Sequence, residues 1–324
     1  MIAVARWLVR GWVAQTLALV LACSPLASDA GTACPPTPQV PTVKQVQAGM
    51  AQARDRGFLW RISKGGHSSW LYGTLHVAKL DWMYPGATVM RAAQSSDRIA
   101  LEMDMLDPDI TRRLAAAMGQ GAGEPLPEAL AQRLRKQADR ACLPPQALES
   151  MSAEMQVTAL SVMSARADGL DPGYAIDPFL ASLGRGWHKP VVSLETPESQ
   201  LELLRSRSEP ERVAVVEKAL DELESDRARA MVRRIADIWA DSRLDELQHY
   251  TQWCDCANTE EERRALHRLI DERNPRLAER IAEIHESGQS VFAAVGSLHM
   301  IGPNGLPALL RQRGYAVERI DFPR

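Results

Sequence analysis

The 324-residue chain lacks the signatures of several common hydrolase classes. It has no Gly-x-Ser-x-Gly nucleophile elbow, no His-Glu-x-x-His zinc helix and no Walker loop. Serine-hydrolase, ordinary zincin and nucleotide-hydrolase functions therefore have no support in the sequence. The chain also lacks low-complexity blocks and heptad arrays, so we do not expect a coiled coil.

Neither positive nor negative charge is in large excess. The chain has 38 Lys and Arg against 41 Asp and Glu, for a net charge of −3. No basic stripe is present, so we expect no nucleic-acid partner. Hydrophobic residues make up 45% and charged residues 24%, which are ordinary globular values and exclude wholesale disorder.

The first thirty residues indicate an export signal rather than part of the fold. Arg6 and Arg10 precede an apolar run over residues 11–22, which is too short for a transmembrane helix. Ser28 and Ala30 supply small residues at both specificity positions of a signal-peptidase site. We therefore expect residues 1–30 to be a signal peptide and the mature protein to be periplasmic.

Cys23 leaves a second possibility open, in which a lipid anchors the protein to the envelope. The stretch Val20-Leu21-Ala22-Cys23 resembles a lipoprotein acylation site, although leucine just before the alanine fits it poorly. Acylation would anchor the protein to the envelope, and a lipid on Cys23 is the sole membrane contact that we expect. Otherwise Cys23 is an ordinary cysteine of a signal peptide.

Four further cysteines follow, and an even number in an oxidising compartment predicts at least one disulfide. The pairing does not follow from the sequence. Cys254 and Cys256 are too close to pair comfortably with each other, so bonds to Cys34 and Cys142 are possible. Together with His249, Cys254 and Cys256 resemble part of a zinc site. Only three potential ligands are present, and the compartment permits disulfides, so we do not expect a metal there.

A four-residue pattern that occurs twice is the strongest signal. Gly73-Thr74-Leu75-His76 and Gly296-Ser297-Leu298-His299 each end an apolar, strand-like run. Each histidine should therefore stand at the carboxyl end of a buried strand, where open α/β sheets place ligands and chemistry. The two histidines are 223 positions apart and could converge on one cleft.

The regions after both patterns are also alike. Pro85 and Pro307 each open a helical stretch, and a further strand follows at residues 98–103 and 316–320. We therefore predict an α/β fold with a central, mostly parallel sheet, built from two related βαβ units with a large helical insertion between them. Residues 190–195 read as another buried parallel strand.

The chain divides into a leader and one domain. Residues 31–56 should be a proline-rich leader and linker, and residues 57–324 a single α/β domain. That domain should hold the helical insertion at about 107–169 and a helical region at about 197–288. In the latter, Thr259 and Glu262 predict a capping box, and Asn274 should cap the following helix.

Paired histidines suit metal binding or acid–base work. Glu102 is the natural third member of the site, because it ends the strand at residues 98–103 and a carboxylate in an apolar sheet is costly unless it is paired or metal-bound. Glu195 is either a strand-end site residue or the first residue of a helix. Four remaining histidines should face solvent: His67, His188, His267 and His285.

These blocks resemble the TraB/GumN family, which is related to the Tiki metalloproteases and, more remotely, to erythromycin esterases and ChaN-type haem-binding lipoproteins. The resemblance covers roughly residues 58–322. It rests on residues 71–76, 101–104, 189–196, 272–274 and 295–302, with Gly314-Tyr315. The region at about 107–169 matches no block, so the resemblance says nothing of substrate specificity.

The resemblance implies one cleft that contains His76, Glu102, Arg273 and His299. In Tiki-like enzymes the centre is a divalent metal ion and the reaction is peptide hydrolysis. Here His76, His299 and Glu102 would hold the ion, Glu102 would complete the site or act as base, and Arg273 would stabilise an oxyanion.

Three functions follow as expectations. The first is a periplasmic, metal-dependent hydrolase that acts on a peptide or protein substrate. The second is a non-catalytic envelope protein that binds haem or a metal with the same histidines. The third is a metal-free, esterase-like hydrolase with a histidine as base. The oligomeric state and the identity of the metal do not follow from the sequence.

Overall fold

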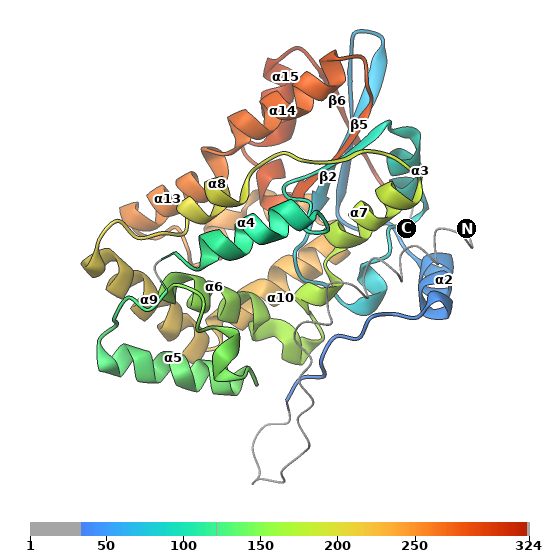
Figure 1. Cartoon of the computed structure of the whole chain (residues 1–324). Coiled ribbons are helices and arrows are strands. Elements are labelled where there is room, and N and C mark those ends of the chain that lie inside the picture. The colour runs from blue at the N-terminus through green and yellow to red at the C-terminus, as the bar shows by residue number, and fades with distance from the viewer. Residues whose placement is uncertain (1–33, 121, 323–324) are drawn as a thin grey trace.

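A computed structural model describes residues 34–120 and 122–322. The expected signal peptide and Cys23 lie outside the described residues. The fold is a six-stranded sheet with helices packed around it (Figure 1). Within the described ranges, no helix combines the length and apolar composition needed to cross a membrane.

The sheet is mixed but mostly parallel. Its strands are β1 Phe58–Lys64, β2 His67–Thr74, β3 Arg98–Leu101, β4 Val191–Ser193, β5 Val291–Gly296 and β6 Ala316–Ile320. Their order is β4-β3-β5-β2-β1-β6, and the neighbours from β4 to β2 are parallel. β1 runs antiparallel to both β2 and β6. The predicted α/β class with a mostly parallel sheet is confirmed.

The two βαβ units interlock in this sheet. The first consists of β2, α3 (Ala87–Ser95) and β3, and the second of β5, α15 (Leu306–Gln312) and β6. β5 lies between β2 and β3, so the strand of the second motif is inserted into the first unit. Thr74 is paired with Gly296, and the two Gly-x-x-His turns therefore leave neighbouring strands at the same edge.

Apolar runs explain why these strands occupy the centre. Every residue of β5 is buried, as expected of a parallel strand covered on both faces. The short β1–β2 turn uses Gly65 and Gly66, whose φ angles of 62° and 84° are ones that a glycine adopts without strain. β4 is parallel as predicted, but it is an edge strand and only partly buried.

Fourteen α-helices surround the sheet in the part of the chain that the structure describes, counting α3 and α15. The remaining helices of more than six residues are α2 Val43–Gln52, α4 Pro108–Met118, α5 Glu128–Arg140, α6 Ala153–Met163, α7 Ile176–Gly186, α9 Glu209–Glu224, α10 Arg227–Ala240, α13 Glu260–Leu266 and α14 Asn274–Glu286.

Shorter helical segments complete the helical region. They are α8 Pro197–Glu202, α11 Leu244–Gln248, α12 Tyr250–Trp253 and the π-helical turn η5 His267–Asp271. The predicted capping box of Thr259 and Glu262 is present at the start of α13. The segment at 31–56, expected to be a linker, includes α2, whose Val46 is buried in the sheet core.

Helices of the insertion and α9 of the later helical region share a second core. α5, α6 and α9 bury leucine and valine side chains against one another, including Leu130, Leu134, Val157, Leu160 and Leu220. Figure 1 shows these helices in one layer with α10, away from α14 and α15 beside the sheet. Trp239 of α10 donates from Nε1 to the Gly73 carbonyl at 2.8 Å, which ties this layer to the first histidine turn.

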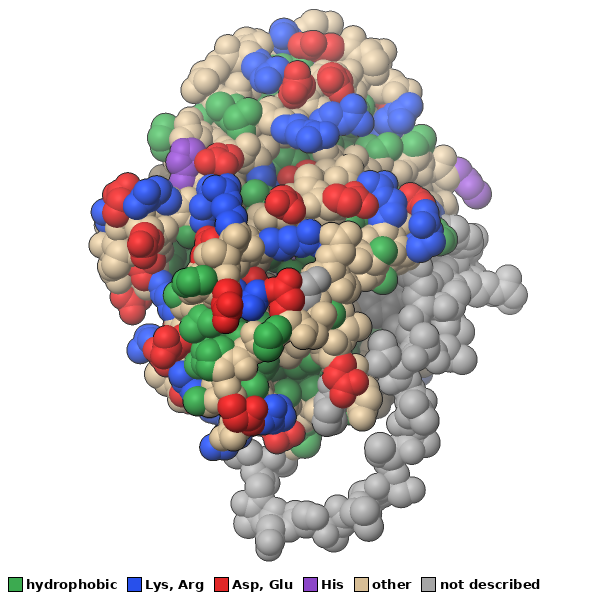
Figure 2. All heavy atoms as spheres, turned by 60° about the vertical axis from the view of Figure 1, so that its left-hand side comes forward, with side chains coloured by type: hydrophobic (Ala, Val, Ile, Leu, Met, Phe, Trp, Pro, Cys, Tyr) green, Lys and Arg blue, Asp and Glu red, His purple; other side chains and the backbone are tan. Residues whose placement is uncertain are grey.

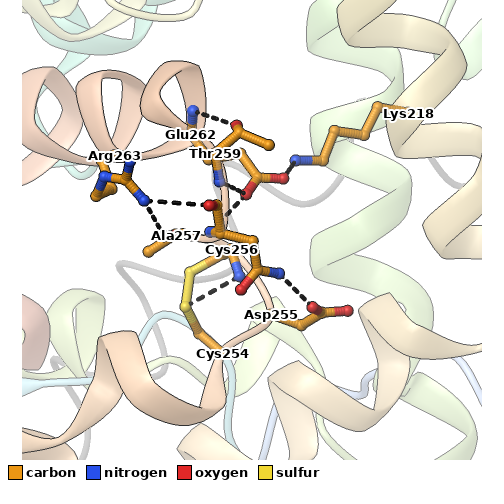
Figure 3. The surroundings of a disulfide bond; sticks show 9 residues. Lys218, Cys254, Asp255, Cys256, Ala257, Thr259, Glu262 and Arg263 are labelled. Atoms are coloured by element: carbon orange, nitrogen blue, oxygen red, sulfur yellow. Dashed lines mark hydrogen bonds and ion pairs between the residues drawn. A yellow bond between two sulfur atoms is a disulfide. The ribbon is translucent and has the colours of Figure 1, made fainter.

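Two disulfides are present, Cys34–Cys142 and Cys254–Cys256, with Cα–Cα distances of 5.8 Å and 5.0 Å. The expectation that Cys254 and Cys256 would not pair with each other is wrong. Asp255 between them adopts a φ of 52°, in the left-handed region, and this turn brings the two Cα atoms within disulfide range (Figure 3).

The face formed by the helices at the left of Figure 1 carries charges of both signs. Lys and Arg side chains lie among Asp and Glu side chains over this face rather than in one basic patch (Figure 2). Ion pairs join neighbouring helices of this region: Arg133 of α5 pairs with Asp221 of α9, and Arg113 of α4 with Glu198 of α8, at 2.5 Å each.

Candidate functional site

His76 lies in the turn after β2 and is held between two carboxylates. Its Nδ1 is 3.4 Å from Oδ2 of Asp177, and its Nε2 is 3.6 Å from Oε1 of Glu102. Asp177 stands in the first turn of α7 and accepts a hydrogen bond from the Thr74 hydroxyl at 2.9 Å. The His76 side chain is 60% exposed, so the ring has an open side towards solvent.

Glu102 follows β3 and is buried, and four groups of the protein surround its carboxylate. Oε1 accepts from the Gly296 backbone N–H at 2.7 Å. Oε2 accepts from Arg273 Nη2 at 2.6 Å and from Gln200 Nε2 at 3.1 Å. β5 lies between the strands that precede Glu102 and His76, and the Glu102 side chain reaches His76 across the end of β5.

Arg273 binds two carboxylates at once. Besides Glu102, it donates to Glu195 from Nε at 2.9 Å and from Nη2. Its Nη1 donates to the Leu269 carbonyl at 3.2 Å. Glu195 is brought here because its backbone N–H continues the β3–β4 pairing by donating to the Glu102 carbonyl at 3.0 Å. Glu195 is therefore a site residue, just ahead of the N-cap Thr196 of α8.

His299 lies in the 3₁₀ turn Ser297–Met300 after β5 and is buried. Its Nδ1 is 2.6 Å from Oδ1 of Asn274. The Asn274 amide nitrogen donates to the Asn304 carbonyl at 2.8 Å, which fixes the amide so that its oxygen faces the imidazole. Nδ1 of His299 therefore carries the proton, and Nε2 is the nitrogen with the free lone pair.

The predicted N-cap role of Asn274 is wrong. α14 begins at Asn274, its N-cap position is Arg273, and no side-chain capping bond forms. The Asn274 side chain is fully buried and binds His299 and Asn304 instead. Tertiary contact outweighed the local capping preference here.

Gly296 marks the point on which the site converges. A Cβ placed on Gly296 would lie 3.1 Å from Oε1 of Glu102, 3.4 Å from Nε2 of His76 and 3.7 Å from Cδ2 of His299. The absence of a side chain at Gly296 therefore lets these three groups face one small space. In the described part of the chain, however, no group of three or more His, Cys, Asp or Glu side chains is already arranged to hold a metal ion.

The two motif histidines differ in their electrostatic surroundings. Burial lowers the pKa of His299 to about 4, although the charge of Glu102 opposes the shift, so His299 is neutral at pH 7. Loss of hydration on the side of the ring that faces the protein would lower the pKa of His76, but hydrogen bonds and charges of Asp177 and Glu102 raise it well above its ordinary value. One imidazole is thus neutral and the other is favoured as a cation.

Glu102 and Arg273 remain charged in this environment. Burial alone would raise the pKa of Glu102, but the hydrogen bond and charge of His76, together with Arg273, hold it well below its ordinary value. Burial would lower the pKa of Arg273, and its bonds to Glu195 and Glu102 raise it instead. Glu102 is therefore a carboxylate whose position is fixed by a permanent cation.

The structure brings His76, Glu102, Arg273 and His299 together at the end of the sheet. It adds three residues that sequence reasoning missed, Asp177, Gln200 and Asn274. Asn274 adjoins Arg273 in the sequence, which could have drawn attention to it. Asp177 and Gln200 belong to ordinary helix starts, and nothing local distinguishes them from capping residues.

The other histidines lie away from this cleft. His188, His249 and His267 are exposed. The expectation that His285 faces solvent is wrong, because it is buried and stacks on His67 with ring centroids 3.8 Å apart. Both rings sit near the β1–β2 turn, where His285 binds Ser69 and the Lys64 carbonyl.

Comparison with known proteins gives one match. Residues 58–319 match the sequence model of the TraB/PrgY/gumN family, and this span includes His76, Glu102, Arg273 and His299. No curated protein matches the chain, and no solved structure does.

Proposed function

Since the chain belongs to the TraB/PrgY/gumN family, we propose that it is an exported, metal-dependent hydrolase that acts on peptide bonds. One observation carries this proposal. The two Gly-x-x-His turns leave adjacent parallel strands, and their histidines face the same buried carboxylate, Glu102. An arrangement assembled from residues so far apart in sequence is typical of a chemical site and unnecessary for a turn.

The donor set suits a divalent cation. Two imidazoles and a carboxylate are ordinary ligands for such ions. His76 and His299 are both held through Nδ1, by Asp177 and Asn274, which is the arrangement that orients a metal-binding histidine and leaves its Nε2 for the ion. We therefore assign His76, His299 and Glu102 as the ligands.

Charge supports the same assignment. Asp177, Glu102 and Glu195 contribute three carboxylates near the cleft, whereas Arg273 is the permanent cation among the site residues described above. His76 would have to lose its proton to bind an ion, and these groups would then carry an excess of negative charge that a divalent ion would offset. A bound ion would supply Lewis-acid activation of water and of the scissile carbonyl.

The side chains of the chain itself supply proton transfer and orientation. Glu102 is ionised and can accept a proton at the oxygen that faces His76. Arg273 holds Glu102 in place, and its Nη1 is the part of the guanidinium that does not bind a carboxylate. We assign to Arg273 Nη1 the stabilisation of the developing oxyanion. The exposed ring of His76 marks the side from which a substrate would enter.

Peptide bonds as the substrate, and export to the periplasm, rest on sequence. The resemblance to Tiki-like proteases supports the substrate, and the Arg6 and Arg10 flank with the short apolar run supports export. N-terminal sequencing of protein from the cell envelope tests export: a start near Gly31 supports it, acylated Cys23 indicates the lipoprotein form, and intact Met1 on cytoplasmic protein contradicts it.

Metal analysis combined with cleavage of a peptide library tests the hydrolase. The wild type and the variants His76→Ala and His299→Ala are compared, with His267→Ala as the matched control on an exposed part of a helix. Bound metal and cleavage should fall together in the first two variants and stay unchanged in the control. Full metal and full activity in both site variants would reject the proposal, and a visible haem spectrum in the purified protein would replace it with a haem-binding function.

A second function, metal-free hydrolysis, is favoured by one observation. Asp177 and His76 form a carboxylate–imidazole pair, the arrangement that makes histidine a general base, and the ring is open to solvent. This function predicts cleavage of ester or amide substrates that survives exhaustive chelation. The metal-dependent function predicts that chelation abolishes cleavage and that added metal restores it.

A further inference from the structure

The Cys254–Cys256 disulfide lies outside the candidate active site, at the end of α12 (Figure 3). The residue Cys254 is buried, with 2% of its surface exposed, whereas Cys256 is only partly buried. One cysteine of the pair is therefore enclosed by the protein and the other is open to approach.

A structural role explains this bond poorly. A disulfide stabilises a protein mainly by restricting the unfolded chain, and the restriction grows with the length of the loop that it closes. The Cys34–Cys142 bond spans 108 positions, but Cys254 and Cys256 are only two positions apart. The shorter bond therefore restricts the unfolded chain far less.

The turn after Cys256 is also held without the sulfur atoms. Arg263 donates from Nη1 to the carbonyls of Ala257 and Asn258, at 3.1 Å each (Figure 3). Glu262 accepts from the Asn258 and Thr259 backbone N–H groups and pairs with Lys218. Opening the disulfide would leave these bonds in place, so the turn should survive it.

The two sulfur atoms differ as leaving groups. The Cys256 backbone N–H donates to Sγ of Cys254 at 3.2 Å. A hydrogen bond to an ionised acceptor is stronger than one to a neutral acceptor, so this contact would stabilise a thiolate on Cys254. A stabilised thiolate leaves faster in exchange reactions. Cys256 is then the sulfur that is attacked and Cys254 the one that leaves.

A cavity gives access to the bond. Both cysteines line a space of about 400 Å³, together with the aromatic side chains of Tyr250 and Trp253 and with Arg227. Arg227 and Arg234 line the space together with Glu222 and Asp255, so its charges are of both signs.

We propose that Cys254 and Cys256 form a thiol–disulfide exchange site whose partner is a dithiol of an exported protein. A partner thiolate attacks Sγ of Cys256, a mixed disulfide forms, and Cys254 leaves as a thiolate. The second partner thiolate then attacks its own sulfur in the mixed disulfide and releases Cys256. Two electrons pass to this protein, whose two thiolates take up the two protons released by the partner, which becomes a disulfide.

Selective reduction tests the site in the full mature chain. The protein is equilibrated with dithiothreitol at a series of reduced-to-oxidised ratios, and alkylated cysteines are identified by mass spectrometry. Cys254 and Cys256 should become reduced while Cys34 and Cys142 stay bonded and the circular dichroism spectrum is unchanged. Reduction of both bonds only on unfolding, or free thiols on Cys254 and Cys256 in air-oxidised protein, would overturn the proposal.

Trapping distinguishes the two sulfur atoms. With oxidised glutathione as the probe, Cys254→Ser should accumulate a mixed disulfide on Cys256, because no resolving thiol remains. Cys256→Ser should form its mixed disulfide far more slowly, because Cys254 is buried. Equal or faster labelling of Cys256→Ser would refute the assigned roles. Neither measurement involves hydrolysis, so these results are independent of the proposed hydrolase.

Discussion

Asn274 accepts a hydrogen bond from His299 through its amide oxygen, with 2.6 Å between Oδ1 and Nδ1. The donation from the Asn274 amide nitrogen to the Asn304 carbonyl prevents the amide from turning round. His299 is neutral in its buried position, so this contact assigns its tautomer and leaves Nε2 for the cleft. Asn274 thus fixes the tautomer of His299, which lies 25 positions later in the sequence.

Replacing Asn274 with leucine should weaken the site without removing a ligand. Loss of an outer-shell partner typically lowers metal affinity or activity by ~10–100-fold, and an unsatisfied buried donor on His299 costs ~1–3 kcal/mol of stability. Metal affinity, cleavage rate and thermal unfolding measure these effects. Asn274→Asp keeps an acceptor and should retain more of both functions. Wild-type metal affinity and rate in Asn274→Leu would contradict the positioning role.

Gly296→Ala should damage the site more than the fold. The added Cβ would stand 3.1 Å from Oε1 of Glu102 and 3.4 Å from Nε2 of His76, so at least one of them must shift. Overpacking of this kind costs ~1–3 kcal/mol, and activity should fall more steeply than stability. The control is Gly119→Ala, where the nearest atoms are 3.7 Å away. Equal activity of the two variants would show that the cleft does not need the space above Gly296.

Arg273→Ala should lower turnover far more than bound metal. The variant loses an oxyanion donor, which typically costs ~10²–10³ in rate, but it leaves all three assigned ligands. It also leaves Glu102 and Glu195 buried without their cation, which destabilises a protein by ~3–5 kcal/mol. Arg273→Lys keeps the charge without the forked geometry and should be intermediate. Rate, metal content and melting temperature are measured for each variant. If Arg273→Ala lost metal as completely as His76→Ala, the prediction would be wrong.

His285 should make the fold sensitive to acid. Its Nε2–H donates to the Lys64 carbonyl at 2.9 Å, and its Nδ1 accepts from the Ser69 hydroxyl at 2.8 Å, so the buried ring is satisfied when neutral. Burial, and the like charge of His67, lower its pKa below the ordinary 6.5. The unfolded chain then binds more protons, so this contribution is present above about pH 6.5 and lost as the pH falls through the lower folded value.

Thermal unfolding between pH 7.5 and about 5 measures that effect, because the window lies around the unfolded and folded pKa values of His285. His285→Gln removes the titrating group and should flatten the pH dependence of the melting temperature, though its stability at pH 7.5 will be lower. His188→Gln, at an exposed position, should leave the pH dependence unchanged. An identical slope in wild type and His285→Gln would show that other groups are responsible.

Local patterns were sufficient for the class of fold and for the candidate residues of the cleft. Apolar runs followed by Gly-x-x-His predicted the ends of β2 and β5, and proline and glycine marked the helices after them. The parallel sheet brings the ends of such strands to one edge, so His76 and His299 could be expected to meet. Burial of Glu102 followed from its place at the end of an apolar strand.

Long-range packing determines the strand order, the partners of Asn274 and the pairing of the cysteines. The strand order, with β5 between β2 and β3, depends on how the two βαβ units interlock. The sequence of either unit alone does not predict it. Asn274 was expected to cap a helix, yet a buried partner outweighs a solvent-exposed cap, and its amide binds His299. Cys254 pairs with Cys256 because Asp255 takes up a left-handed conformation, which Asp adopts more readily than most residues but which the local sequence does not impose.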